Sequence, residues 1–398
     1  MTHRVAIVGA GPSGFYAADG LLRGRPDLRI DIIDRLPTPF GLVRAGVAPD
    51  HQGTKAVVRQ FDRLLAQPDL RFAGNIEIGR DLTWDEVIQS YDAVVVATGM
   101  VVDRKLGIPG EDLPHVWGSW RFVAWLNGHP DFRGGPDLSG VKSVAVIGNG
   151  NVALDVARLL AKTPDEMTKS DIVPEAAAAI AAAPIADIHV IGRRGAGEAS
   201  FTTNELAEMG RLARAVSVAD ASVLTAEAPA ADPTPERLRK AKNIETLKRF
   251  AAQTPAEKPV TVHFRFHAVP TAIRPGEIEL STSQTTERLA ADLVVTCIGY
   301  TGEPFPQAES VFPVGWARRG PSGTIPTNRA DSHAVAKEVI DFLEDRDPKS
   351  GPDILPLCVD AEGWRRIDKA EVAAGTAQGR PRVKLVDWQA LLDIAQGD

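Results

Sequence analysis

The chain has 398 residues, of which 44% are hydrophobic and 24% are charged, and its formal net charge is −7 at pH 7. This length exceeds what one compact core usually holds, so we expect two domains. An acidic chain argues against general nucleic-acid binding, which needs a basic face. No run of about 18 apolar residues is present, so we expect a cytoplasmic protein with no membrane span and no signal peptide.

The only two cysteines are Cys297 and Cys358, and they form no CxxC pair. The chain also has no Cys/His cluster with the spacing of metal ligands. We therefore expect no disulfide, no bound metal and no thiol-based active site.

The N-terminal sequence has the pattern of a strand, a tight turn and a helix. The apolar run from Val5 to Val8 leads into Gly9-Ala-Gly11-Pro-Ser-Gly14 and then into an apolar helical stretch. Gly9 permits the turn, Gly11 leaves space for a pyrophosphate, and Gly14 lets the helix pack close to the strand. Amide groups at the start of such a helix face the anion.

The next predicted strand, residues 29–33, ends in Asp34. A carboxylate in this place accepts hydrogen bonds from a ribose diol and repels a 2′-phosphate. The first site therefore favours a dinucleotide without that phosphate.

The same pattern recurs further along the chain. A predicted strand at 143–147 leads into Gly148-Asn-Gly-Asn-Val-Ala153, and the following strand, 188–191, is succeeded by Arg193 and Arg194. Paired guanidinium groups suit a dianionic 2′-phosphate. The spacing to these arginines exceeds that of the usual motif, which predicts an extra helical insertion in the alanine-rich stretch 168–183.

One glycine motif is weak evidence, because such turns also serve packing alone. Two motifs with opposite charges on their partner strands are much stronger. They predict FAD at the acid-terminated site and NADPH at the arginine-terminated site, and hence a flavin reductase.

Two near copies of a buried strand, at 91–99 and 291–299, indicate how the domains are arranged. We interpret them as the points where the chain leaves one dinucleotide domain and later returns to it. The prediction is an α/β protein with two Rossmann-like domains in a glutathione-reductase-like arrangement. An NADP-binding domain at residues 101–290 is inserted into an FAD-binding domain formed by residues 1–100 and 291–398.

Within the insertion, residues 219–235 have the composition of an exposed excursion, and residues 236–249 predict a basic surface helix. Glu236 with Lys240 and Glu245 with Arg249 have the spacing of ion pairs on one helix face. Two interpretations stay open: a solvated helix face, or a docking surface for an acidic partner.

The run from Pro39 to His51, Pro-Phe-Gly-Leu-Val-Arg-Ala-Gly-Val-Ala-Pro-Asp-His, resembles the adrenodoxin reductase family, including its bacterial NADPH-ferredoxin reductases. The likeness covers nearly the whole chain. The other matching stretches are 148–155, 190–195, 201–209 and 315–325, and 379–385 matches the bacterial branch and precedes a predicted helix at 388–395.

The resemblance implies which residues hold the two cofactors. FAD would be contacted by Pro12, Ser13, Asp34, Leu42 and Ile78, and its flavin would be held by Trp316, Gly323, Thr324 and Ile325. NADPH or NADP+ would be bound by Gly148, Asn149, Gly150, Asn151, Val152, Arg193, Arg194 and Glu205, with Gly323 touching the nicotinamide end.

The resemblance also places His51, Asp155 and Glu208 near the flavin and the nicotinamide, as candidate catalytic residues. They would orient the nicotinamide or tune the flavin, since hydride passes directly between the rings. A structural hydrogen-bonding role is the alternative for His51.

Two further expectations concern the C-terminal part of the chain. Asp331 and Ser332 are expected to cap the helix that follows them. The stretch between Gly302 and Gly315 is shorter than the family pattern.

These observations predict an NADPH-ferredoxin reductase that passes single electrons from FAD to a [2Fe-2S] or other small ferredoxin. The partner would present an acidic surface to basic residues such as Arg237, Arg239 and Lys240, and the family expectation is a monomer. A glutamate-synthase-type electron-transferring subunit usually needs cysteine-bound clusters, and a pyridine-nucleotide disulfide reductase needs a CxxC pair. A non-catalytic nucleotide-binding protein with the same fold is the remaining alternative.

Overall fold

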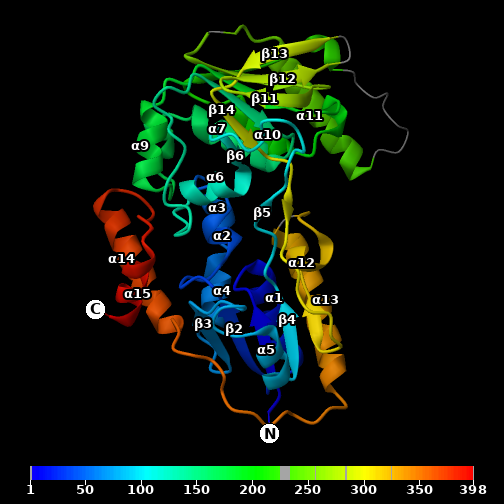
Figure 1. Ribbon diagram of the computed structural model, residues 1–398, viewed down its shortest axis with the longest axis vertical. Coiled ribbons are helices and arrows are strands. Elements are labelled where there is room, and N and C mark those ends of the chain that lie inside the picture. Colours follow the sequence, from blue (N-terminus) through cyan, green and yellow to red (C-terminus); the bar gives the residue numbers. More distant parts are fainter. Residues whose placement is uncertain (1, 225–233, 256, 283–284, 324, 398) are drawn as a thin grey trace. The chain divides into compact units, whose positions relative to one another are not determined.

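The computed structural model describes every residue except 1, 225–233, 256, 283–284, 324 and 398 (Figure 1). The chain divides into two compact units. The first contains Met1–Val102, Asn127–Arg133 and Tyr300–Asp398, and the second contains Asp103–Leu126 and Gly134–Gly299. Short strands β5 (Val102–Asp103) and β15 (Tyr300–Thr301), in the two connecting segments, pair with each other.

The first unit is built on a parallel sheet with the strand order β16-β4-β1-β2-β3. Side chains alternate between its two faces: Val5 and Ile7 belong to one apolar core, and Ala6 and Val8 to another. Helices on both faces make the central strands apolar throughout. The strands are β1 (Arg4–Val8), β2 (Arg29–Asp34), β3 (Leu70–Gly74), β4 (Ala93–Val96) and β16 (Val311–Pro313).

The helices of the first unit include two long ones, α13 and α14 (Figure 1). In chain order they are α1 (Pro12–Gly24), α2 (Leu42–Ala45), α3 (Gln52–Lys55), α4 (Val58–Leu64), α5 (Trp84–Ser90), α12 (Trp316–Arg319), α13 (Ile325–Leu343), α14 (Ala361–Ala377) and α15 (Trp388–Gln396).

The second unit contains a parallel sheet with the order β6-β14-β7-β8-β10-β9. An antiparallel sheet, β11-β12-β13, covers part of one face through Ile278 and Leu280. The parallel strands are β6 (Val116–Gly118), β7 (Ser143–Ile147), β8 (Asp187–Ile191), β9 (Ala215–Ala219), β10 (Val260–Arg265) and β14 (Leu293–Thr296). The antiparallel ones are β11 (Val269–Arg274), β12 (Glu277–Ser281) and β13 (Thr286–Ala290).

The remaining helices of the second unit are α6 (Ser119–Leu126), α7 (Asn151–Ala161), α8 (Pro164–Met167), α9 (Pro174–Ala182), α10 (Thr203–Met209) and α11 (Pro235–Ala251), with short 3₁₀ turns η1 (Ala196–Glu198) and η2 (Ala221–Val223). In the described part of the chain, no helix combines the length and apolar character needed to cross a membrane.

The structure confirms three predicted helices. The helical insertion predicted at 168–183 contains α9, the basic helix predicted at 236–249 is α11, and the helix predicted at 388–395 is α15. Two sequence-based expectations are wrong. The second junction lies at Gly299/Tyr300 and not at 290/291, because β14 pairs with β6 and β7. Residues 127–133 belong to the first unit. Most of the expected excursion at 219–235 lies outside the described residues.

Helices α1 and α13 pack closely because α1 presents glycines to its neighbour. A Cβ atom built on Gly20 would lie 2.7 Å from Cβ of Ala336, and one on Gly24 would lie 2.5 Å from Cδ1 of Ile340. This close approach fixes α13 beside α1, the helix that follows the first glycine loop.

Replacing Gly20 by alanine tests this packing. Alanine usually stabilises a helix interior by roughly 1 kcal/mol relative to glycine, but overpacking costs about 1–3 kcal/mol. We expect Gly20→Ala to lower the melting temperature, and Gly20→Ala with Ala336→Gly to recover part of the loss. Gly53→Ala is the control, since its added Cβ meets no atom within 4 Å. Equal melting temperatures for Gly20→Ala and the control would contradict the packing argument.

Candidate functional site

The first glycine loop has the geometry that its sequence predicted. Gly9 has φ +111°, and a Cβ there would lie 2.4 Å from the carbonyl oxygen of Ala97. A Cβ on Gly14 would lie 2.1 Å from the carbonyl oxygen of Gly9. At Gly11, the N-cap of α1, an added Cβ would meet no atom within 4 Å. The loop therefore turns tightly, packs closely and leaves open space before the helix N-terminus.

Asp34 joins this loop to the end of β2. Its carboxylate accepts hydrogen bonds from the backbone N–H of Ala10 at 2.7 Å and of Leu36 at 2.8 Å. Burial raises the pKa of Asp34, although these two donors oppose the shift. The carboxylate is thus held rigidly beside the loop, a structural role that adds to the predicted contact with ribose.

The run from Pro39 to His51 lies directly on the first loop. Gly41 has φ +46°, and a Cβ there would lie 2.9 Å from Cα of Gly11, while the N–H of Phe40 donates to the carbonyl of Ala10 at 2.7 Å. Leu42 begins α2, and His51 is the N-cap of α3; both are half-buried. Ile78, also half-buried, packs against the core that contains Val8.

A buried ion-pair network connects the same run to the C-terminal segment. Glu371, which is 1% exposed, accepts two hydrogen bonds from Arg44, at 2.8 and 2.5 Å, and one from Arg382 at 3.1 Å. Burial opposes ionisation, but the two guanidinium groups hold the pKa of Glu371 below its ordinary value. Because these ion pairs are buried, loss of either the carboxylate or a guanidinium group would leave an uncompensated charge. The network therefore holds the runs 39–51 and 379–385 together.

The segment 127–133 belongs to this part of the molecule. The amide oxygen of Asn127 accepts hydrogen bonds from Lys55 at 2.7 Å and from Lys384 at 2.9 Å. A pocket in the first unit is lined by Leu36, Thr38, Gly41, Arg44, Asn127 and His129, among others. The signature run therefore forms one wall of a pocket next to the first loop.

The glycine-tryptophan motif lies against the start of α1. Gly315 has φ +63°, and a Cβ there would lie 2.0 Å from Oγ of Ser13. The ring of Trp316 stacks on Tyr300 with centroids 6.0 Å apart.

The structure also places the other residues predicted to contact FAD. Gly323 has a φ of +87°, a backbone conformation that favours glycine. Ile325 begins α13 and Pro12 is at the first turn of α1, whereas Thr324 lies outside the described residues.

The expectation that Asp331 and Ser332 cap a helix is wrong. Both lie inside α13, which begins at Ile325, so their backbones continue the helix. The carboxylate of Asp331 instead accepts a hydrogen bond from the N–H of Gly315 at 2.7 Å. This bond holds the glycine-tryptophan turn against α13.

The second glycine loop repeats the geometry of the first. Gly148 has φ +144°, and a Cβ there would lie 2.3 Å from the carbonyl oxygen of Cys297. Gly150 is the N-cap of α7, and Val152 is half-buried in its first turn. The side-chain oxygen of Asn151 accepts from the N–H of Thr202 at 2.7 Å, which ties the run 201–209 to the loop.

Arg193 and Arg194 are exposed on the turn that follows β8. The turn approaches the second loop so closely that a Cβ on Gly192 would lie 1.6 Å from the amide nitrogen of Asn149. The side-chain oxygen of Asn149 is buried and has no hydrogen-bond partner in the described part of the chain. Two exposed guanidinium groups and an unsatisfied amide oxygen thus lie next to the second glycine loop.

Asp155, Glu205 and Glu208 converge on the guanidinium group of Arg158. The group is fully buried and lies 2.7 Å from Asp155, 3.0 Å from Glu205 and 3.5 Å from Glu208. Three of the carboxylates predicted to serve the cofactors therefore share one buried counter-charge. This places α7 and α10 in a fixed relation beside the second loop.

Known proteins match this arrangement over the whole chain. The family model described as pyridine nucleotide-disulphide oxidoreductase matches residues 3–189. The NADPH-ferredoxin reductase FprA of Mycobacterium leprae is 36% identical, with 99% of each chain covered. The mitochondrial NADPH:adrenodoxin oxidoreductase of Drosophila melanogaster is 34% identical, with 99% of this chain and 94% of that protein covered. The chain belongs to the adrenodoxin reductase family.

A solved structure gives the same result. Mycobacterium tuberculosis FprA in complex with NADPH superposes with a TM-score of 0.93 at 36% identity, covering 100% of both chains. The predicted fold class and the predicted family of NADPH-dependent flavin oxidoreductases are confirmed. The alignment with the M. leprae protein extends over 456 positions, whereas this chain has 398 residues. The M. leprae protein therefore has insertions relative to this chain. A short segment between Gly302 and Gly315 stays a prediction.

Arg158 and Glu371 of this family member were missed by the sequence analysis. Arg158 follows Asp155 by three residues within an apolar helix, and this spacing is the signal that would have indicated an ion pair on the buried face. For Glu371 no local signal exists, because Arg44 lies far away in the sequence.

Removing the buried cation tests the Arg158 cluster. We expect Arg158→Met to lower the free energy of unfolding by about 3 kcal/mol, because three neighbouring carboxylates lose their counter-charge. Urea unfolding at pH 7 measures the effect. Exposed Arg211→Met is the control, and a stability equal to the wild type would contradict the cluster.

Proposed function

We propose that this chain is an NADPH-ferredoxin reductase that works in the cytoplasm. The observation that carries the proposal is a pair of phosphate loops with opposite charge beside them, Asp34 at the first loop and Arg193 with Arg194 at the second. FprA, named an NADPH-ferredoxin reductase, supports the same conclusion. When bound, FAD accepts a hydride from NADPH and releases its electrons singly to a one-electron acceptor.

The first unit fits FAD. The amides at the start of α1 would bind the pyrophosphate, in the space that Gly11 leaves open. The carboxylate of Asp34 would receive the ribose hydroxyls while the amides of Ala10 and Leu36 keep it in place. We further assign FAD contacts to Ser13, Leu42, Ile78, Trp316, Gly323, Thr324 and Ile325.

The second unit fits NADPH. The amides at the start of α7 would bind its pyrophosphate, and Arg193 and Arg194 would bind the 2′-phosphate through charge-assisted hydrogen bonds. The unsatisfied oxygen of Asn149 would accept a hydrogen bond from a ribose hydroxyl or an amide of the ligand. Glu205, fixed by Arg158, is a further contact.

We assign orienting roles to His51, Asp155 and Glu208, because a direct hydride transfer needs alignment and not a proton-transfer catalyst. Arg158 pairs with Asp155 and Glu208 and fixes their positions, so it is a positioning residue. The chain contributes preorganised charges, while the redox chemistry belongs to the cofactor.

A substitution at Gly11 can test FAD binding without disturbing folding, because an added side chain would enter open space. Gly11 has φ −83° and ψ −178°, which any residue can adopt, so Gly11→Val should fold as the wild type does. We expect the same far-UV spectrum and apo melting temperature, but FAD affinity lower by at least about tenfold, or 1.4 kcal/mol. Gly14→Ala should instead impair folding, because its Cβ overlaps the carbonyl of Gly9. Wild-type FAD affinity in Gly11→Val would contradict the assignment of the FAD site.

The two arginines determine the preference for NADPH over NADH. We expect Arg193→Ala with Arg194→Ala to raise the KM for NADPH in flavin reduction by more than about tenfold, since hydrogen bonds to charged groups contribute about 1.5–3 kcal/mol each. Reduction by NADH should be unchanged. Stopped-flow flavin absorbance measures both, with exposed Lys142→Ala as the control. The assignment of the 2′-phosphate site fails if the wild type prefers NADH and the double variant reduces its flavin with NADPH as fast as the wild type does.

Helix α11 is the proposed docking surface for the ferredoxin. Arg237 and Lys242 are exposed on this helix, and the side chain of Leu238 between them is 50% exposed. Of the residues first singled out, Arg239 donates to the carbonyl of Phe201 at 2.7 Å and Lys240 pairs with Glu236 at 3.1 Å. We therefore assign the steering of an acidic [2Fe-2S] or other small ferredoxin chiefly to Arg237 and Lys242.

Reversing these charges tests the docking surface. We expect Arg237→Glu with Lys242→Glu to slow ferredoxin reduction at low ionic strength by about tenfold or more, and to flatten its salt dependence. Flavin reduction by NADPH should be unchanged. Lys142→Glu with Arg211→Glu alters the net charge equally in the same unit and serves as the control. If both double variants keep the wild-type turnover and salt dependence, the ferredoxin docks elsewhere.

A further inference from the structure

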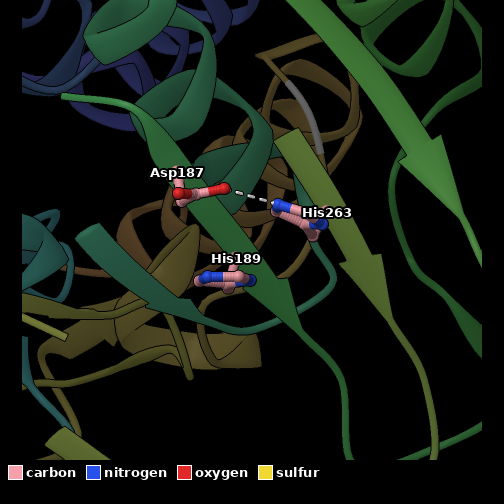
Figure 2. Close-up of side chains that lie close together, drawn as sticks. All are labelled: Asp187, His189 and His263. Atoms are coloured by element: carbon pink, nitrogen blue, oxygen red, sulfur yellow. Dashed lines mark hydrogen bonds and ion pairs between the residues drawn. The ribbon is translucent and has the colours of Figure 1, made fainter. Parts of the chain in front are cut away.

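Two histidines and an aspartate of the second unit meet away from the proposed NADPH site. Asp187 and His189 lie two residues apart on β8, and the parallel register pairs His189 with His263 of β10. The three side chains therefore share one face of the sheet (Figure 2). Asp187 begins β8, whereas Arg193 follows its other end, so the proposed cofactor site and this cluster lie at opposite ends of the strand.

The three side chains already lie at distances suited to a shared ion. Nε2 of His263 lies 2.8 Å from a carboxylate oxygen of Asp187, and the two imidazole rings stack with centroids 4.5 Å apart. One ligand atom from each residue lies within 4.8 Å of the others. Ligands of a tetrahedral Zn²⁺ lie about 3.4 Å from one another, given metal–ligand bonds near 2.0–2.1 Å. Shifts of about 1 Å would therefore complete the geometry.

We propose that Asp187, His189 and His263 form a binding site for a divalent transition metal of the Zn²⁺ class. Two imidazoles with one carboxylate are the donors that such ions prefer, whereas Mg²⁺ and Ca²⁺ prefer sites made of oxygen ligands. The ion has a path from solvent, because the side chains of His263 and Asp187 are 24% and 46% exposed. Water would fill the fourth position.

Arg265 is the competitor for this site. Its Nε donates to Nδ1 of His189 at 3.3 Å, and its Nη1 pairs with Glu287 of β13 at 2.6 Å. The hydrogen bond shows that Nδ1 of His189 presents a lone pair to a cation. A metal would take the place of the guanidinium group, which would remain paired with Glu287. The bound ion would then join the neighbouring strands β8 and β10 beside the edge of the antiparallel sheet.

Zinc titration of the purified holoenzyme, treated with chelator and dialysed, tests the site. We expect calorimetry to find one Zn²⁺ bound per chain at this site, and Zn²⁺ to raise the melting temperature in a concentration-dependent way. Mg²⁺ and Ca²⁺ should have no such effect. His263→Gln and Asp187→Asn should each weaken Zn²⁺ binding by at least about tenfold. Arg265→Gln should strengthen it, because the competing cation is gone.

The variants also separate loss of binding from loss of folding. Melting temperatures without metal identify any variant that misfolds. Of these variants, Asp187→Asn changes the shape of the side chain least, and the side chain of Asp187 is half-buried. Weaker Zn²⁺ binding in Arg265→Gln would refute the placement beside Nδ1 of His189. A wild type without a Zn²⁺-dependent shift, or one that binds Zn²⁺ no more tightly than folded Asp187→Asn, would overturn the proposal.

Discussion

Both units depend on one steric constraint, a glycine that turns from a strand into a helix beneath a neighbouring carbonyl. Gly9 makes this turn under Ala97, and Gly148 makes it under Cys297, each with a positive φ and no room for a Cβ. The turn directs the helix N-terminus toward the end of the sheet, where a phosphate can meet unpaired amides. The geometry of both glycine loops and the placement of the adjacent strands follow from this constraint.

The same constraint explains the two similar strands that the sequence contains at 91–99 and 291–299. Each lies beside the loop strand of its own unit, β4 next to β1 and β14 next to β7, and each supplies the carbonyl above the turning glycine. They are therefore equivalent parts of two Rossmann-like sheets. The chain leaves the first unit soon after the strand at 91–99 and returns to it directly after the strand at 291–299. Because the strand at 291–299 belongs to the second unit, the second junction follows that strand and does not precede it.

Patterns that are local in sequence allowed correct predictions, and contacts between distant residues did not. The glycine turns, the helix α11 and the arginines after β8 follow from neighbouring residues, so the sequence alone indicated them. The ion pair of Arg44 with Glu371 and the bond from Gly315 to Asp331 depend on packing that no spacing reveals. The role of Asp331 was predicted wrongly for this reason. Its local sequence suggested a helix cap, whereas its hydrogen-bond partner, Gly315, lies in the separate glycine-tryptophan turn.

The two glycine loops differ in the charge beside them: a carboxylate lies at the first loop, and guanidinium groups lie at the second. Backbone amides fix the carboxylate at the first loop, and exposed guanidinium groups lie beside the second, where we propose that they bind a phosphate. Buried Arg158 and buried Glu371 then fix the elements around each loop with paired charges. Rigid placement of charge is what direct hydride transfer requires of the protein.

The most direct test of the central claim is an anaerobic titration of the purified protein with NADPH, followed by an acidic small ferredoxin. We expect a yellow protein whose flavin absorbance is lost on addition of NADPH and restored by oxidised ferredoxin, with two ferredoxins reduced per NADPH. A colourless protein, or a flavin that NADPH does not reduce, would contradict it.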